Sequence, residues 1–175
     1  MHREPSQARP PMNPVHLIQI QTILLVSLLL LPGCSFDPLG TPAPEITTTP
    51  GRQQIQYCRD VMYIHPELVL EPVGYYYEHG FQDDQIAFKF IARTRQLDGI
   101  FDPAFIPPSE LVTRKSNIGL ERDIGQPWWD SHTQTLIGGN FTVPPPGSQG
   151  TRGLNVGIAD NGDDTFTVYV YWFET

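Results

Sequence analysis

The residues that could bind a metal ion lack the spacing of a known metal site. Carboxylates surround the Asn161-Gly162 turn, and Ca²⁺ prefers carboxylate oxygens, but the EF-hand spacing and its closing Glu are missing. The histidines and nearby acids likewise show no H-E-x-x-H or comparable pattern. An acidic hairpin tip and scattered surface histidines are the preferred interpretation, and no metal or other cofactor is expected. The residues concerned are Asp160, Asp163, Asp164, His65, His79, His132, Glu67, Asp83 and Asp84.

Nucleophilic catalysis has no better support in the sequence. Asp130, Ser131 and His132 are the residue types of a catalytic triad, but consecutive residues cannot face one another as a triad requires. A catalytic site in this chain would therefore have to assemble from residues distant in sequence.

One cysteine lies where its thiol would be modified. An uncharged run of 15 residues, Leu17 to Leu31, ends at Leu31-Pro32-Gly33-Cys34, with two arginines upstream. The run is shorter than the roughly 20 apolar residues of a membrane-spanning helix, which favours a secretory signal. The motif resembles the lipobox of bacterial lipoproteins, although Pro32 is a less usual occupant. The resemblance implies cleavage after Gly33, thioether lipidation of Cys34 and acylation of the new amino terminus, with residues 1–33 as the signal peptide.

Such an anchor would make the membrane the first partner of this chain. Two or more acyl chains hold a protein firmly, whereas one chain binds reversibly. Position two of the mature chain is Ser35 and not Asp, which by the same resemblance favours the outer membrane if the host is Gram-negative. The envelope type of the host stays open, as does the choice between Met1 and Met12 as the start.

Charge and cysteine count bound the rest of the chain. Removing residues 1–33 takes away two basic and one acidic residue, so the formal charge changes from −8 to −9. An acidic surface repels phosphate backbones, and nucleic-acid binding is not expected. If Cys34 carries lipid, Cys58 has no cysteine partner and is interpreted as a buried small apolar residue, with a nucleophile as the alternative.

The pattern of residues predicts one folded domain on a tether. Residues 34–52 hold the lipidated cysteine and a stretch rich in Pro and Thr, which favours an extended spacer. Residues 53–175 form a single globular domain. Within it we expect a short helix over residues 53–64, ending before Pro66, and a hairpin over residues 73–93 with period-two alternation.

The middle and the end of the chain complete the predicted sheet. Residues 97–127 are expected to be mostly loop over one sheet face, and residues 135–143 a strand with a kink or bulge at Gly138-Gly139. Alternating apolar residues on both sides of Asn161-Gly162 predict a hairpin, and burial of both apolar rows on one face requires a loop of three or five residues. The expected fold class is α+β, mainly an antiparallel sheet of four to six strands with one or two short helices.

Two further stretches bear on function. Residues 155–164 running into residues 169–175, together with Trp128-Trp129-Asp130, resemble the carboxyl-terminal half of small uncharacterised bacterial lipoproteins, and this resemblance implies no activity. If the chain stays extended after Pro127, Trp128 and Trp129 point to opposite sides. One ring would then enter the core, and the other would be a candidate partner contact beside Asp130. The alternative is that both rings are core.

The expected function follows from the anchor and from the lack of a catalytic motif. We expect a membrane-anchored lipoprotein of the bacterial cell envelope, with a non-enzymatic domain that binds another envelope component or an incoming protein. The alternative is a hydrolase or metal-binding enzyme whose site is built from residues distant in sequence.

Overall fold

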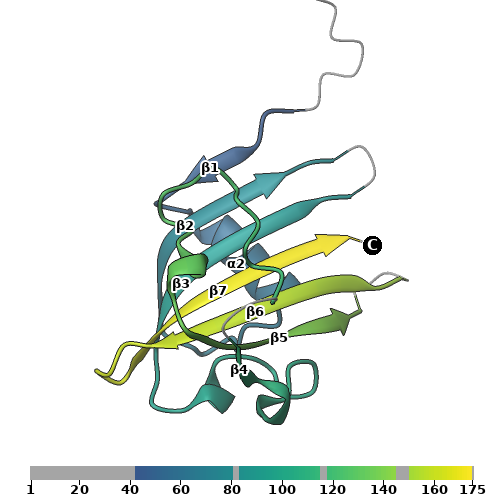
Figure 1. Ribbon diagram of the computed structural model, residues 1–175. Coiled ribbons are helices and arrows are strands. Elements are labelled where there is room, and N and C mark those ends of the chain that lie inside the picture. The colour runs from purple at the N-terminus through teal and green to yellow at the C-terminus, as the bar shows by residue number, and fades with distance from the viewer. Residues whose placement is uncertain (1–41, 81–82, 115–117, 145–149, 175) are drawn as a thin grey trace, which may run out of the picture. The chain divides into compact units, whose positions relative to one another are not determined.

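The computed structural model describes residues 42–80, 83–114, 118–144 and 150–174, and these form one antiparallel sheet with one α-helix. The sheet has seven strands in the order β1-β2-β3-β7-β6-β5-β4 (Figure 1). The expected class holds in its coarse form, since the described structure is mostly antiparallel β with little helix. The elements are β1 (Glu45–Thr47), α2 (Arg52–Val61), β2 (Leu70–Glu78), β3 (Gln85–Arg93), β4 (Val112–Arg114), β5 (Leu136–Val143), β6 (Arg152–Asp160) and β7 (Thr165–Glu174).

The sheet is made of two antiparallel meanders that meet in its middle. Strands β1 to β3 form one, strands β4 to β7 form the other, and β3 pairs with β7 along its whole length. Between them the chain runs from the centre of the sheet to its far edge through short 3₁₀ turns at Leu97–Gly99 and Pro108–Glu110. The carboxyl-terminal strand β7 is therefore central, with β3 on one side and β6 on the other.

The expected strand number was too low because both edge strands are very short. Strands β1 and β4 have three residues each, which is too few for a period-two pattern to be recognised. Strand β1 pairs with Tyr75–Tyr77 of β2, although residues 34–52 were expected to be tether. The folded part therefore begins before position 53.

One face of the sheet packs against α2, and we call it the α2 face. The helix buries Cys58 and Val61 on the apolar rows of the central strands. Burial raises the pKa of the Cys58 thiol, which has no exposed surface, and the prediction of a buried small apolar residue is confirmed. The helix ends at Val61, earlier than predicted, and Tyr63 takes a left-handed φ of 55°. The rows from β3, β6 and β7 are Ile86, Phe88, Phe90, Leu154, Val156, Ile158, Val168, Val170 and Trp172.

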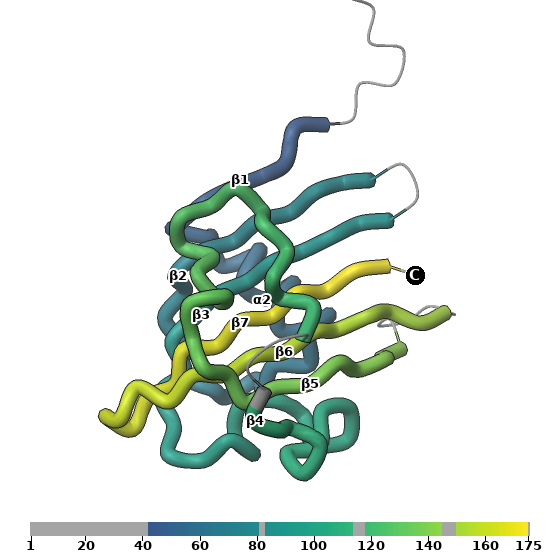
Figure 2. The backbone as a smooth tube through the Cα atoms, in the orientation of Figure 1, coloured from purple at the N-terminus to yellow at the C-terminus, as the bar shows by residue number. Residues whose placement is uncertain are grey.

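The opposite face is covered by residues 118–134, which we call the strap. Figure 2 shows this segment crossing the sheet on the side away from α2. Its buried residues Ile118, Leu120 and Trp129 form a second apolar cluster with residues of the sheet. The prediction that residues 97–127 cover one face needs correction, since Ile100 and Phe101 pack into the α2-face core while the strap covers the other face. The sheet residues under the strap are Tyr76, Ala87, Leu136, Ala159, Tyr169 and Tyr171.

Both predicted hairpins are present. Strands β2 and β3 pair as expected. In the β6–β7 hairpin, Ile158 lies opposite Val168, so both apolar rows share the α2 face as the burial argument required. Because the Asn161 amide donates to the Thr165 carbonyl at 3.1 Å, the loop holds an odd number of residues, with Gly162 at a φ of +78°.

The predicted bulge at Gly138-Gly139 is wrong. Pairing between β5 and β6 is continuous through both residues, and the register shift in the sheet lies instead between Pro72 and Gly74 of β2. A Cβ at Gly138 would lie 2.1 Å from the carbonyl oxygen of Val156 and 3.0 Å from Cδ1 of Ile118. Glycine is thus needed there because the strap and the neighbouring strand approach closely.

Candidate functional site

A partly buried ion pair fastens the strap to the sheet. Lys89 of β3 is only 8% exposed, and its Nζ donates to Oδ1 of Asp130 in the strap at 2.6 Å. The same oxygen accepts a hydrogen bond from the Tyr169 hydroxyl of β7 at 2.7 Å. The Lys89 ammonium also lies 4.9 Å from the centre of the Tyr169 ring, within reach of a cation–π interaction. Strap, β3 and β7 are therefore joined at one carboxylate.

The electrostatics of this cluster fix the protonation of two members. Burial alone would raise the pKa of the Asp130 carboxyl, but hydrogen bonds from Lys89 and Tyr169 outweigh it and hold that pKa below its ordinary value. Burial first, and then the bond to Asp130, raises the pKa of the Tyr169 phenol. At neutral pH Tyr169 therefore stays a donor and Asp130 stays charged, which suits a fixed attachment of the strap.

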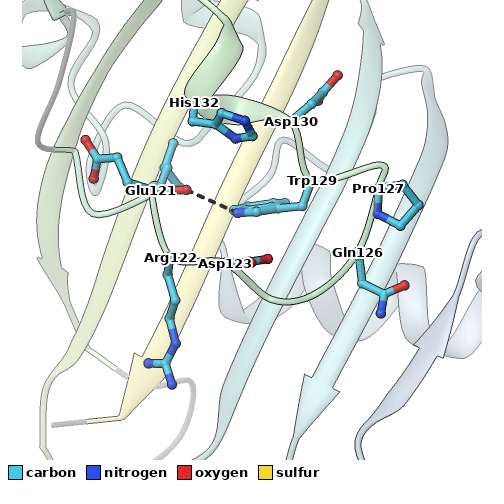
Figure 3. Close-up of a pocket in the computed structure, with 9 residues that line it drawn as sticks. Glu121, Arg122, Asp123, Gln126, Pro127, Trp129, Asp130 and His132 are labelled. Carbon is cyan, nitrogen blue, oxygen red and sulfur yellow. Dashed lines mark hydrogen bonds between the residues drawn. The ribbon is translucent and has the colours of Figure 1, made fainter.

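The strap encloses a cleft beside this cluster. The cleft has a volume of about 360 Å³ and is shown in Figure 3. The strap is held in shape by two hydrogen bonds to the Leu120 carbonyl, one from Trp129 Nε1 at 3.1 Å and one from the Ser131 hydroxyl at 2.7 Å. The lining residues are Leu120, Glu121, Arg122, Asp123, Gln126, Pro127, Trp129, Asp130 and His132.

Arg122 separates this cleft from a smaller one. The second cleft has a volume of about 300 Å³ and includes Gln85 and Tyr171 in its lining, and Arg122 lines both clefts. The guanidinium carbon of Arg122 lies 5.8 Å from the centre of the Tyr171 ring. Arg122 is thus directed onto an aromatic ring of the sheet, and Figure 3 shows it extending away from the larger cleft.

The two neighbouring tryptophans lie on the same face of the sheet, which is closer to the alternative that both rings are core than to rings on opposite sides. Pro127 and Trp128 form a turn in which the Trp129 amide donates to the Gln126 carbonyl at 3.0 Å. Both rings pack against the strap-face cluster, at right angles to each other with centres 5.9 Å apart. Trp129 is buried and Trp128 is half-buried, with its ring over Gly74. A turn replaces the extended backbone on which the prediction depended.

The other candidate residues are held by local contacts. The Ser131 hydroxyl donates to Leu120 and His132 is exposed, so the two do not form a triad. At the hairpin tip Asp160 accepts from the Gly162 amide at 2.8 Å, and Asp164 pairs with Arg95 at 2.9 Å. Across the described parts of the chain, no three His, Cys, Asp or Glu side chains are grouped so as to hold a metal ion.

Of the residues that line the cleft, sequence reasoning singled out Trp129, Asp130 and His132 and missed the others. Arg122, Asp123 and Gln126 lie in a stretch without periodicity, so no pattern marks them. One signal could have found them: Tyr169 and Tyr171 alternate with the apolar row of β7, which indicates that its second face is covered too. Cys34 lies outside the described residues. No helix within the described ranges is long and apolar enough to span a membrane.

The chain matches no family model, no curated protein and no solved structure.

Proposed function

We propose that this chain is a membrane-anchored lipoprotein of the bacterial cell envelope, and that its folded part binds a partner without catalysing a reaction. The observation that carries the proposal is Leu31-Pro32-Gly33-Cys34 at the end of an uncharged run. Residues 1–33 leave as the signal peptide, and Cys34 becomes the lipidated amino terminus. Each buried methylene contributes about 0.8 kcal/mol, so several acyl chains hold the protein on the membrane.

The short tether limits how far the domain reaches from the membrane. Eleven residue steps separate Cys34 from Glu45, the first residue of β1. A fully extended chain spans at most about 3.6 Å per residue, so the tether covers no more than about 40 Å. The partner is therefore an envelope component near the membrane, or an incoming protein that comes this close to it.

The polar residues that could act in catalysis already make hydrogen bonds within the fold, which supports a binding role over a catalytic one. Asp130 accepts from two donors of the sheet, and the Ser131 hydroxyl is bonded to a carbonyl. The Cys58 thiol is buried in the α2-face core, and burial raises its pKa, which suppresses the thiolate that nucleophilic catalysis needs. These residues fasten the fold, whereas the clefts of the strap are open to a partner.

Metabolic labelling tests the anchor with a matched control inside the same chain. Labelled palmitate is expected to enter the wild-type protein and Cys58→Ala, and not Cys34→Ala, whose precursor should accumulate uncleaved. Cys58→Ala removes the other cysteine, so it controls for nonspecific thiol labelling. Equal labelling of the wild type and Cys34→Ala would refute the proposal. In a Gram-negative host, Ser35 predicts recovery of the mature protein with the outer membrane when the two membranes are separated by density.

A further inference from the structure

The cleft of the strap pairs one carboxylate with one aromatic ring. Figure 3 shows the Asp123 carboxylate pointing into the enclosed space, while the side chains of Glu121 and Arg122 extend away from it. The indole of Trp129 is seen nearly edge-on above the same space, so one face of the ring looks into it. The two groups lie six positions apart in the strap, and the hydrogen bond from Trp129 to Leu120 closes the loop that holds them.

The Asp123 carboxylate retains capacity to accept hydrogen bonds. Its Oδ1 accepts from the Gly125 amide at 2.7 Å, which fixes the orientation of the side chain. Its Oδ2 makes no hydrogen bond, and the carboxylate no ion pair, with another residue of the described ranges. The neighbouring Asp130 differs, because Lys89 balances its charge. Asp123 is thus a negative charge that is oriented but not neutralised by a described cation.

A carboxylate opposite an indole face is suited to a cation with N–H donors. An ammonium or guanidinium group is attracted by the face of Trp more than by any other aromatic ring. The same group donates charge-assisted hydrogen bonds to a carboxylate. A volume of about 360 Å³ lies at the lower end of the roughly 300 to 1,000 Å³ typical of ligand clefts, so it suits a single side chain rather than a large ligand.

We propose that the cleft between Asp123 and Trp129 receives a Lys or Arg side chain of the partner protein. The inference rests on the proposed binding function, and it names the chemistry of the partner. The formal charge of −9 for the chain without residues 1–33 adds a general attraction for a basic partner. Because Trp129 and Asp123 are already held by hydrogen bonds, little side-chain freedom is lost when the cation enters.

A peptide titration tests this site directly. The full-length protein in detergent is titrated with an acetylated, amidated peptide of alternating Gly and Arg, followed by calorimetry and tryptophan fluorescence. The control peptide has citrulline at each Arg position and so keeps the shape without the charge. We expect Asp123→Asn, which retains an acceptor for Gly125, to weaken binding of the arginine peptide about tenfold or more. Asp98→Asn, the same change at an exposed carboxylate outside the strap, should change it less than twofold.

Each outcome decides the proposal. Selective loss in Asp123→Asn, with no binding of the citrulline peptide, supports it. If Asp98→Asn weakened binding as much as Asp123→Asn, the attraction would be a general effect of the negative charge, and the proposal would be overturned. Equal binding of the citrulline peptide would overturn the proposal as well. No binding of the arginine peptide, or binding of a Gly–Glu peptide that depends on Arg122, would also overturn it. None of these results affects palmitate labelling of Cys34, so failure here is distinguishable from failure of the proposed anchor.

Discussion

Removing Asp130 should destabilise the fold more than removing its partner Lys89. Lys89 is 8% exposed, so Asp130→Ala leaves an ammonium without its ion-pair partner under the strap. Breaking a fully buried pair in this way costs about 3 to 5 kcal/mol. The Asp130 side chain is 39% exposed, so water screens the pair and can reach the orphaned charge. We therefore expect a loss of about 2 kcal/mol for Asp130→Ala, below the fully buried range.

The reciprocal change should cost less. Lys89→Met removes the charge but keeps an unbranched stem on the sheet, and the half-exposed Asp130 still accepts from Tyr169 at 2.7 Å. The expected loss is about 1 kcal/mol, the net value of one hydrogen bond. The double variant leaves no unpaired charge under the strap, so its loss should be smaller than the sum of the two single losses by about 1 kcal/mol or more.

Urea unfolding of the full-length protein in detergent measures these differences. Unfolding at pH 7 is followed by tryptophan fluorescence and by far-ultraviolet circular dichroism, because Trp129 reports on the strap and dichroism on the sheet. A loss for Lys89→Met that equals or exceeds the loss for Asp130→Ala would contradict the reasoning. Strict additivity in the double variant would show that the two residues do not interact as the structure describes.

Acid provides an independent measurement on the same pair. The pKa of the Asp130 carboxyl in the fold lies below its ordinary value of 3.8, so the unfolded chain takes up the proton first as the pH falls. The stabilisation is therefore complete above about pH 4 to 5 and is lost as the pH falls through the lower, folded pKa. Between about pH 5 and pH 2 the wild type should lose more stability than Asp130→Asn. Parallel loss in both proteins would assign acid sensitivity to other carboxylates.

Two more changes probe the sheet and its cover. Deleting residues 171–175 removes Trp172, which is 3% exposed, from the central strand β7. Loss of a buried Trp side chain typically costs about 3 to 5 kcal/mol, so the truncated protein should lose its cooperative thermal transition. An unchanged melting temperature would show that this end of β7 is dispensable. Gly74→Ala places a methyl group 2.2 Å from Cδ2 of Trp128, so it should displace that ring and lower the melting temperature. The control is Gly125→Ala, where the backbone φ is +68° but no atom lies within 4 Å of the added methyl group. This control should leave the fluorescence maximum of the tryptophans unchanged. An unshifted maximum in Gly74→Ala would mean that Trp128 does not cover this glycine.

The parts of the fold that sequence predicts are those set by neighbouring residues. The β6–β7 hairpin follows from two alternating rows and a turn, and its register follows because both rows must be buried together. The β2–β3 hairpin follows in the same way. Helix α2 has only ten residues and begins close to its predicted start, but it ends before the limit that Pro66 sets, because Tyr63 takes a left-handed φ.

The positions of the edge strands and of the two tryptophans depend on tertiary contacts that no local sequence pattern indicates. Strand β1 exists because Tyr75–Tyr77 offers it an edge, and its own three residues carry no pattern. The placement of Trp128 and Trp129 on opposite sides held only for an extended backbone, and the alternative was that both rings are core. A turn at Pro127 places both rings on the strap face, and the preference of a residue before proline says nothing about the residues after it.

The strap could have been predicted from the residues that β6 and β7 place on the face away from α2. On the strap face, β6 presents small residues such as Gly153 and Gly157, while the neighbouring β7 presents Tyr171 and Phe173. The Phe173 ring lies over Gly153, and Leu120 of the strap lies over Gly157. Large rings beside glycines make a surface that excludes water only if a further segment covers it. This pairing therefore predicts a cover on the second face of the sheet. What it could not predict is where the cover is fastened, because Asp130 lies 41 residues from Lys89 and 39 from Tyr169 along the chain. The cleft between Asp123 and Trp129 is lined by strap residues alone and is shaped by the hydrogen bonds to the Leu120 carbonyl, which no motif of the sequence indicates.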